Sequence, residues 1–587
     1  MAKKNKTYSP GKDIVTHLAV VAIIILLNYI HSFNFGRFDL TEDNRYTLSE
    51  NTVNLLQNED RLKDRIFFKI YLEGDLPADI MKIRNAIKEK LDEFIIYAGD
   101  NIQYEFIDPH GEEDEDYNLQ VQKNIYSEGI TPTDIEILES GKQEIKTIWP
   151  GALIEYKGTT SGRVQFFDKK VIYSGENLRG LADKAINNLE YLLISAVRRV
   201  TADKKKTVAF LHGHGELLPQ ETMDVRKGLS QYYLTEDVEI NGRINALDNT
   251  DALIIAKPEN RFTEKDKFVI DQFIMNGGRV LWFVDPLNVN RDSLYRTGNT
   301  FGMSANLNIE KDMIYKYGAR LNNNMIVDSD CGPIFIPGHP LGVVDWYFYP
   351  LLQRADHPIT KNIDPVKAEY VSTIDLVNES DKDVKKTVLL TSSYNSQIFR
   401  APARVNYTII DVDPNFNDEK AGNFPVAVML EGNFTSAFEN RPISDAFLNS
   451  KDYHTRFKSD STKMLVVSDG DIIRNEVVDS AFVNGEWRYK FMPINADVYG
   501  VRKPNSTPKY AYGNKDFVLN SIDYMLDDFS LIGIRTKTIT LRSLDIEKIN
   551  KEKEFWKMVN IAFPLLFIGL IGGVQLVWRR RKYAKID

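Results

Sequence analysis

The sequence predicts an α/β protein, with a large body of strands and helices and one transmembrane helix at each end. Short apolar runs alternate with amphipathic helical stretches, which is the pattern of parallel sheets covered by helices. Of the 587 residues, 43% are hydrophobic and 27% are charged, a composition typical of folded domains. Two long runs without a charged residue lie near the two ends of the chain.

The two apolar runs, residues 14–30 and 558–578, are each long enough for a membrane-crossing helix. Four lysines precede the first run, which we expect to remain as an anchor and not to be cleaved as a signal peptide. Trp578 closes the second run, and four basic residues follow it directly. The predicted order is a cytoplasmic tail (1–13), a transmembrane helix (14–35), an N-terminal α/β domain (36–203), a second α/β domain (204–540) with a long insertion around 330–460, a linker helix (541–557), a transmembrane helix (558–578) and a cytoplasmic tail (579–587).

The charge distribution predicts the topology. The two tails hold a net charge of +7 within the chain's total of −9, which leaves −16 for the segment between them. Because cytoplasmic flanks of membrane helices are basic, we expect both termini in the cytoplasm and residues 36–557 in the periplasm, with both anchors in the inner membrane. The acidic balance also argues against nucleic-acid binding. Cys331 is the only cysteine, which excludes an intramolecular disulfide and a zinc site of paired cysteines.

The N-terminal domain is predicted from a strand–helix–strand order. Thr47 or Ser49 can cap a short first helix. A strand (65–72), a helix (77–97), a strand (101–107), two paired strands (152–156 and 163–167) and a long helix (177–200) follow. The βαβ unit is compatible with a thioredoxin-like layer, but no CxxC motif supports a redox role.

The second domain is predicted as a Rossmann-like parallel sheet. Its expected strands are 207–211, 238–240, 252–256, 280–284 and 463–467, and its expected helices include one capped by Thr263 and one at 516–526. The helix capped by Thr263 is expected to end at Gly277-Gly278, because glycine suits a left-handed C-cap. We expect residues 330–440 to be an irregular excursion, after which the chain returns to the same sheet.

The motif HGHGE follows the first strand of this domain, where α/β sheets place their ligands. His212, His214 and Glu216 are therefore candidates for a metal or catalytic site. Three ligands within five residues is an unusual zinc spacing, however, and the glycines suit a sharp turn without a ligand. We expect no catalytic residue and no metal in this motif.

Other catalytic motifs are missing. Cys331 is flanked by loop-forming residues, and no GxSxG motif occurs. The segment 175–184 has Leu181-Ala182 where a phosphate loop requires Lys-Ser/Thr, so we expect no ATP hydrolysis and no cofactor. Three carboxylates follow predicted strands, at Asp285, Asp469 and Asp471; they could form a carboxylate site, although turns and caps commonly use aspartate at such positions.

Two further sets of residues are candidates for contacts with partners. The aromatic run Trp346, Tyr347, Phe348 and Tyr349 could form a ligand or partner patch, and burial against the following Pro-Leu-Leu is the favoured alternative. In the second transmembrane helix, small or helix-breaking residues favour close packing against another helix, with a GxxxG pair among them. These membrane-packing candidates are Pro564, Gly569, Gly572 and Gly573.

Five further segments have a recognisable sequence: DLTEDNRYTLSENT, TVAFLHGHGE, VLWFVDPLNV, HPITKNIDPV and GNKDFVLNSIDYML. In this order they resemble the GldG family, the auxiliary subunits of gliding-motility ABC transporters in Bacteroidota. The resemblance covers most of the chain and is strongest at residues 37–57, 207–216 and 510–527.

The resemblance implies a non-enzymatic subunit that works with a GldF-like permease and, through it, a GldA-like ATPase. It also implies a role in gliding and type IX secretion, and a GIFT-type domain related to class I glutamine amidotransferases without their catalytic cysteine. We expect the periplasmic body to act as a scaffold or force-coupling element. The alternative is a binding module that captures an envelope ligand, either a glycan or a lipid.

Overall fold

In the computed structural model the chain forms two compact units, Met1–Thr538 and Ile539–Asp587. The residues that it describes are 47–58, 60–112, 114–139, 142–167, 171–173, 176–202, 204–377, 383–411, 416, 421–441, 455–483, 486–496, 512–526 and 546–583, with the single positions 18, 19, 22, 23, 26, 531 and 534. The predicted N-terminal transmembrane helix (14–35) lies outside the described residues, apart from these isolated positions.

The first sheet contains the predicted βαβ unit. Its strand order is β2-β1-β5-β6, with β1 (Ile66–Ile70) parallel to β2 (Ile102–Phe106). Helix α3 (Ala78–Ala98) connects these two strands. Strands β5 (Gly151–Tyr156) and β6 (Thr159–Gln165) form an antiparallel hairpin. Lys157 and Gly158 between them both have positive φ, as a two-residue type I′ turn requires. The predicted strand pairing is confirmed, whereas the thioredoxin-like assignment stays a prediction.

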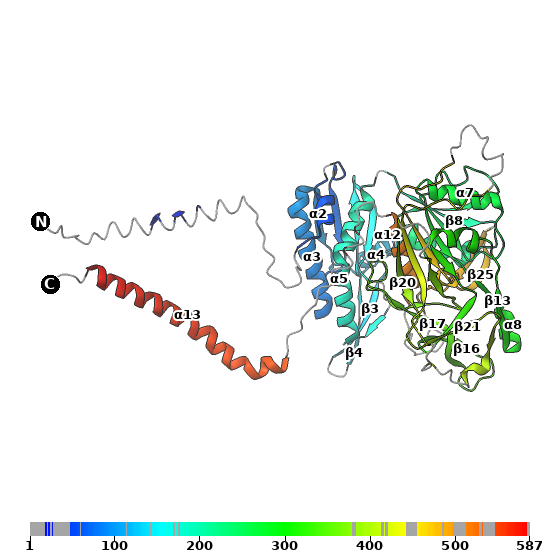
Figure 1. The fold of residues 1–587 in the computed structure, drawn as a ribbon. Helices are drawn as coiled ribbons and strands as arrows, with labels where there is room; N and C mark the ends of the chain where they lie inside the picture. Colours follow the sequence, from blue (N-terminus) through cyan, green and yellow to red (C-terminus); the bar gives the residue numbers. More distant parts are fainter. Residues whose placement is uncertain are drawn as a thin grey trace. The chain divides into compact units, whose positions relative to one another are not determined.

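Two further helices, α2 and α5, belong to this part of the chain. Helix α2 (Glu50–Leu56) begins at Ser49, whose side chain accepts a hydrogen bond from the Thr52 N–H, so this predicted cap is confirmed. Helix α5 (Glu176–Val200) packs beside α3 (Figure 1). A helix and a small sheet are inserted between β2 and α5: α4 (Glu115–Ser127) and the strands β3 (Thr133–Glu139), β4 (Lys142–Ile148) and β7 (Val171–Tyr173).

The second sheet begins with five parallel strands in the order β9-β8-β10-β11-β24. They are β8 (Thr207–His212), β9 (Leu234–Glu239), β10 (Ala252–Ala256), β11 (Arg279–Phe283) and β24 (Thr462–Val467). In chain order this is 2-1-3-4-5, one of the two common doubly wound arrangements. The predicted strand at 238–240 was misplaced, because β9 is a mostly exposed edge strand whose polar residues hide it.

We expected residues 330–440 to be irregular, but they form regular strands. They contain β16 (Cys331–Phe335), β17 (Val343–Arg354), β20 (Val384–Thr391) and β23 (Pro425–Gly432), which extend the same sheet with antiparallel strands. Register shifts in β16 and β20 interrupt the two-residue alternation by which a strand is recognised in sequence. The predicted return of the chain to the sheet, by contrast, is confirmed, since β24 lies beside β11.

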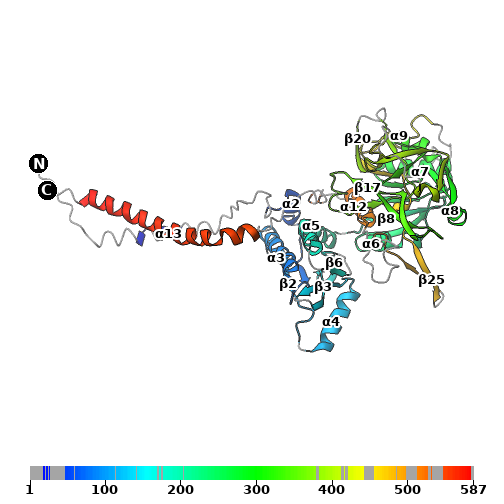
Figure 2. The same ribbon diagram turned by 90° about the horizontal axis from the view of Figure 1, so that it is seen from below.

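Smaller elements complete this part of the chain. Figure 2 shows the β25 hairpin projecting from it. The remaining strands are β12 (Leu287–Val289), β13 (Asn299–Ser304), β14 (Ala319–Leu321), β15 (Asn324–Asp328), β18 (Val366–Lys367), β19 (Ile374–Leu376), β21 (Ser396–Arg400), β22 (Ala403–Asn406), β25 (Val477–Val483) and β26 (Glu486–Phe491). The remaining helices are α6 (Met223–Leu229), α7 (Glu264–Met275), α8 (Arg291–Thr297), a π-helical turn (Glu310–Ile314), α9 (Tyr315–Tyr317) and α12 (Asn514–Leu526).

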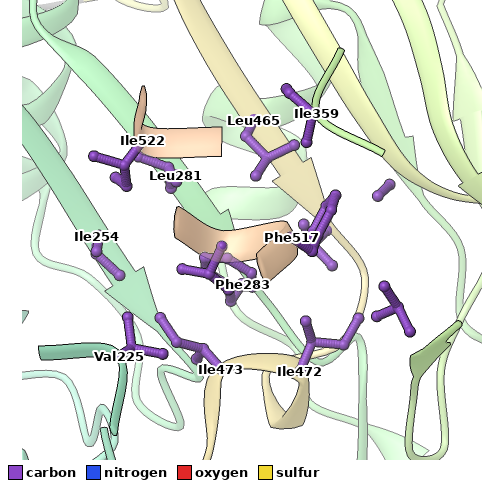
Figure 3. Packing of buried hydrophobic residues seen from close by; sticks show 14 of the residues in the cluster. Val225, Ile254, Leu281, Phe283, Ile359, Leu465, Ile472, Ile473, Phe517 and Ile522 are labelled. Carbon is purple, nitrogen blue, oxygen red and sulfur yellow. The ribbon is translucent and has the colours of Figure 1, made fainter. Parts of the chain in front are cut away.

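The large sheet is buried on both faces. Alternate residues of β8 face opposite cores, with Phe210 in one and Leu211 in the other. On the first face, Phe517 and Ile522 of α12 pack against Phe283 and other strand residues (Figure 3). Burying one such side chain stabilises the fold by about 1.5–3 kcal/mol. Helices on both faces explain why the central strands read as unbroken apolar runs such as ALIIA.

The second unit contains one long helix, α13 (Ile546–Tyr583). By length and composition, the segment Lys551–Trp578 could cross a membrane, with a mean hydropathy of 2.1 and no buried residue. We predicted a linker helix leading into the span, and α13 runs continuously through both segments. The physical reason is that Lys557 and Met558 at the junction are good helix formers, so nothing interrupts the helix there.

Candidate functional site

The HGHGE motif forms the turn after β8, as its glycines predicted. Gly213 and Gly215 have φ values of 116° and 78°, which residues with a side chain rarely adopt. His212 and His214 leave this turn toward different elements. His212 Nε2 lies 2.7 Å from Asp237 Oδ1 on β9, whereas His214 lies against α7. The three candidate residues therefore do not converge on one point.

His214 is buried between two carboxylates. Its Nδ1 lies 3.1 Å from Glu216 Oε1 and its Nε2 lies 3.2 Å from Asp266 Oδ2. The ring also stacks on Phe262 at 3.8 Å. Burial lowers the pKa of His214, but hydrogen bonds to Asp266 and Glu216 outweigh it and raise the pKa to about 9. The imidazolium form has no lone pair for a metal, so these surroundings disfavour metal binding by His214 at neutral pH. Within the described ranges, no group of three His, Cys, Asp or Glu residues is placed to hold a metal ion.

The three strand-end aspartates do lie together, at the carboxyl ends of β11 and β24. Asp471 is the centre of this cluster, with a side chain only 3% exposed. Its Oδ2 lies 2.6 Å from Lys257 Nζ and 2.9 Å from Arg291 Nη2, and its Oδ1 lies 3.0 Å from Arg474 Nη1. Asp285 contacts the same lysine at 3.0 Å. We call the group Lys257, Asp285, Arg291, Glu369, Asp469, Asp471 and Arg474 the strand-end charge cluster.

Two other carboxylates complete the cluster. Glu369 forms ion pairs with Arg291 and with Lys367, whose Nζ lies 2.8 Å from Glu369 Oε1. Asp469 accepts hydrogen bonds from the backbone N–H groups of Glu369 and Asp471, at 2.6 and 2.7 Å. Asp469 therefore connects the backbone of the segment that contains Glu369 to the backbone of the loop after β24.

The aspartates of the cluster titrate differently. Burial raises the pKa of Asp471, but Arg291, Arg474 and Lys257 outweigh it and lower the pKa, which keeps this carboxylate ionised. Burial, with the negative charges of Asp471 and Asp285, raises the pKa of Asp469 well above its ordinary value. The cluster therefore combines an aspartate whose pKa is lowered with one whose pKa is raised.

A cavity of about 300 Å³ opens against this cluster. Lys257, Asp285, Arg291, Asp471 and Arg474 line it, together with residues of the β12–α8 segment and Tyr370. Lys257 and Tyr370 both have positive φ, at 54° and 56°. Such strained backbone is concentrated at functional sites in proteins. The cavity lies outside the carboxyl ends of parallel strands, the usual ligand position in open α/β sheets.

Comparisons with known proteins bear on the role of this structure. The family model described as an ABC-type uncharacterized transport system matches residues 205–521, which is more than half of the chain. The chain belongs to this family. It is accordingly an auxiliary component of an ABC-type transport system, and it associates with an ABC transporter.

The comparisons also found three further similarities for this auxiliary component. A domain of unknown function (DUF7088) matches residues 42–155. An uncharacterized protein of Borreliella burgdorferi is 22% identical over 437 residues, which cover 73% of this chain and 79% of that protein. A solved structure, the mmIFT52 N-terminal domain, is 14% identical with a TM-score of 0.28, covering 46% of this chain and 88% of its own.

Three residues of the aromatic run of the auxiliary component are buried, namely Trp346, Phe348 and Tyr349, and Tyr347 is half-buried, so the run as a whole does not form an exposed patch. Trp346 and Phe348 lie two apart on β17, face the same core and are fully buried. Tyr349 is also buried, with its ring 5.4 Å from that of Tyr370, and Tyr347 packs on Phe416. Burial was the favoured alternative, and the strand geometry explains it.

We expected Cys331 to lie in a loop, but it is the first residue of β16. Its thiol is buried, and burial raises the pKa to about 12. The reactive thiolate is therefore strongly disfavoured at neutral pH.

The membrane-packing candidates of the auxiliary component lie in α13. Pro564 is inside the helix. Among the described residues, and apart from the helix's own backbone, no atom lies within 4 Å of an added Cβ at Gly569, Gly572 or Gly573, so these positions leave room for another helix.

Sequence reasoning identified the aspartates of the strand-end charge cluster but missed its cations. The Lys257 position, directly after a buried strand, was a usable signal, and so was the i,i+3 spacing of Asp471 and Arg474. Arg291 and Glu369 could not be found, because they reach the site from segments whose position depends on the fold of the whole chain.

Proposed function

We propose that this protein is a non-enzymatic, membrane-anchored subunit whose periplasmic body acts as a scaffold or force-coupling element of its ABC transporter. The observation that carries the proposal is the role of α5. Two adjacent residues of this helix, Glu190 and Tyr191, hold the two ends of the periplasmic body.

Glu190 holds the start of the body. Its Oε1 accepts hydrogen bonds from the Ser49 N–H at 2.7 Å and from the Thr52 hydroxyl at 2.9 Å. Lys90 of α3 lies 3.6 Å from its other oxygen. These contacts connect α2, the segment that follows the proposed N-terminal anchor, to α5.

Tyr191 holds the other end. Its hydroxyl donates to Asp523 Oδ2 on α12 at 2.7 Å, and the Tyr233 hydroxyl donates to Asp523 Oδ1 at 2.6 Å. Arg199 lies 3.6 Å from the same carboxylate and its guanidinium stacks over Tyr232 at 3.4 Å. Helix α12 precedes α13 in the chain. A displacement at one end of the periplasmic body would therefore reach the other end through one helix, α5. We call the group Tyr191, Arg199, Tyr233 and Asp523 the α5–α12 clasp.

The cellular setting that we propose comes from the family resemblance noted in the sequence. It is gliding motility and type IX secretion, with a GldF-like permease and a GldA-like ATPase as partners, and with thioredoxin-like and GIFT-type domains in the body. We also propose, from the basic residues that flank both apolar runs, that both termini lie in the cytoplasm. A reporter that is active only outside the cytoplasm should therefore give no signal when fused after residue 587, and a clear signal would contradict this topology.

The coupling role can be tested by weakening the contacts of α5 at both ends of the body without breaking the complex. In a variant with Glu190→Gln, which weakens the contact to α2, and Tyr191→Phe, which weakens the α5–α12 clasp, we expect the permease still to co-purify and its ATPase partner still to hydrolyse ATP, while gliding and secretion decline. Tyr126→Phe on the exposed face of α4 is the matched control. If the clasp exchanges amide hydrogens faster in the variant, yet gliding and secretion stay normal, α5 does not couple the two ends.

A second candidate function is the capture of an envelope ligand. The strand-end cavity favours it, because charged side chains line a hollow at the usual ligand position of an α/β sheet.

A further inference from the structure

We propose that the strand-end cavity binds a small zwitterion, a molecule that carries an ammonium group and either a carboxylate or a phosphate. The inference does not depend on the scaffold role, and it specifies the ligand chemistry of the binding alternative.

The wall of the cavity carries charges of both signs. Its cations are Lys257, Arg291 and Arg474, and its acidic residues are Glu259, Asp285, Asp292 and Asp471. Such a balanced wall would not discriminate strongly in favour of a simple anion or a simple cation. A ligand with both charges can complement both sets of side chains at once.

Arg474 offers donors to a ligand in this wall. Its guanidinium forms ion pairs with Asp471 at 3.0 Å and with Glu369 at 3.8 Å. A guanidinium has five N–H donors, so these two contacts leave donors for a ligand. Asp471 Oδ1 is itself buried against Arg474, so the carboxylates that a ligand ammonium can reach are those of Glu259, Asp285 and Asp292.

The guanidinium groups of Arg474 and Arg291 remain accessible from the cavity. The side chain of Arg474 is 19% exposed and that of Arg291 is 29% exposed, through the cavity that both line. Lys257 and Arg291 fix Asp471 from the opposite side, at 2.6 and 2.9 Å. A guanidinium can bind a carboxylate or phosphate through two parallel hydrogen bonds, while the carboxylates bind the ammonium.

The size of the site limits the ligand. A volume of about 300 Å³ is at the lower end of small-molecule sites. It suits a free amino acid, the end of a short peptide or a single lipid headgroup. The exposed carboxylates Glu259 and Asp292 oppose any ligand with several negative charges.

Calorimetric titration of the full chain in detergent, with its permease, tests the proposal. Diglycine and phosphoethanolamine are the zwitterionic probes, and acetate, inorganic phosphate and methylammonium are the single-charge controls. We expect at least one zwitterion to bind about tenfold or more tightly than any control. Tighter binding of phosphoethanolamine would indicate a lipid headgroup, and tighter binding of diglycine a peptide end.

Substitution of Arg474 tests whether the zwitterion binds in the strand-end cavity. Arg474→Gln should weaken binding of the preferred zwitterion by about tenfold or more, since a charged hydrogen bond is lost. Arg296→Gln, on the exposed face of α8 and outside the cavity, should leave binding unchanged. Unchanged unfolding temperature and permease co-purification show that the Arg474 variant is folded. The proposal is overturned if no zwitterion binds, if a single-charge control binds as tightly, or if a folded Arg474→Gln protein binds normally.

Discussion

The hydroxyl of Tyr191 lies 2.7 Å from Asp523 Oδ2, although 332 positions of the chain separate the two residues. This hydrogen bond is buried and it belongs to the α5–α12 clasp. It connects a helix that packs on the first sheet to a helix that packs on the second. The clasp is thus a point where the two sheet systems depend on each other for stability.

Asp523→Asn should destabilise the folded body strongly. Burial raises the pKa of Asp523, but Arg199, Arg198 and the two tyrosine hydroxyls lower it overall, so the residue is ionised. Removing its charge leaves the Arg199 guanidinium buried without compensation, a change that typically costs about 3–5 kcal/mol. Urea unfolding of the purified protein measures the effect. Asp479→Asn on the exposed β25 hairpin is the matched control, and an equal, small effect of both substitutions would contradict the structural importance of the clasp.

His214 should make stability depend on pH in the alkaline range. Its folded-state pKa of about 9 lies above the ordinary value of 6.5, so its contribution is complete below pH 6.5 and is lost as the pH rises through 9. The full contribution is on the order of 3 kcal/mol. Unfolding measurements between pH 6 and 10 should show this decline, and His214→Gln should flatten it. A wild-type protein whose stability is constant across this range would disprove the assignment.

Glu310→Gln should stabilise the protein above neutral pH. Glu310 lies in the π-helical turn, and burial raises its pKa to about 7, with Lys311 opposing the shift. Its Oε1 has no hydrogen-bond partner among the described residues. The stability associated with the protonated carboxyl is present below pH 4.5 and is lost as the pH rises through 7. At pH 8 the glutamine variant should be more stable by about 2–3 kcal/mol, and at pH 4 the difference should vanish. A destabilised variant at pH 8 would show that the ionised form is favoured in the fold.

Gly569→Leu combined with Gly573→Leu should reduce co-purification of the permease. These glycines are four residues apart on α13, and small residues let helix backbones approach closely in lipid. Quantitative pull-down from detergent extracts measures the effect, with Val574→Leu as the control. Normal recovery of the permease would exclude this face of α13 from the interface.

The local features of the fold followed from the sequence. Residue patterns predicted α2 with its Ser49 cap, the hairpin around Lys157-Gly158 and the buried strands β8, β10, β11 and β24. Each of these depends on neighbouring residues only, through side-chain periodicity, capping hydrogen bonds or positive φ. The apolar segment in α13 was predictable for the same reason, since a charge-free run is a local property.

The features that concern function required the tertiary structure. The sequence placed Asp285, Asp469 and Asp471 at strand ends, and the sheet order then brought them together. Only the folded chain shows that Arg291 and Glu369 arrive at the same point, that residues 330–440 extend the sheet, and that Tyr191 meets Asp523. Their positions depend on strand pairing and helix packing between distant segments, and no local pattern records which distant partner a buried charge will have.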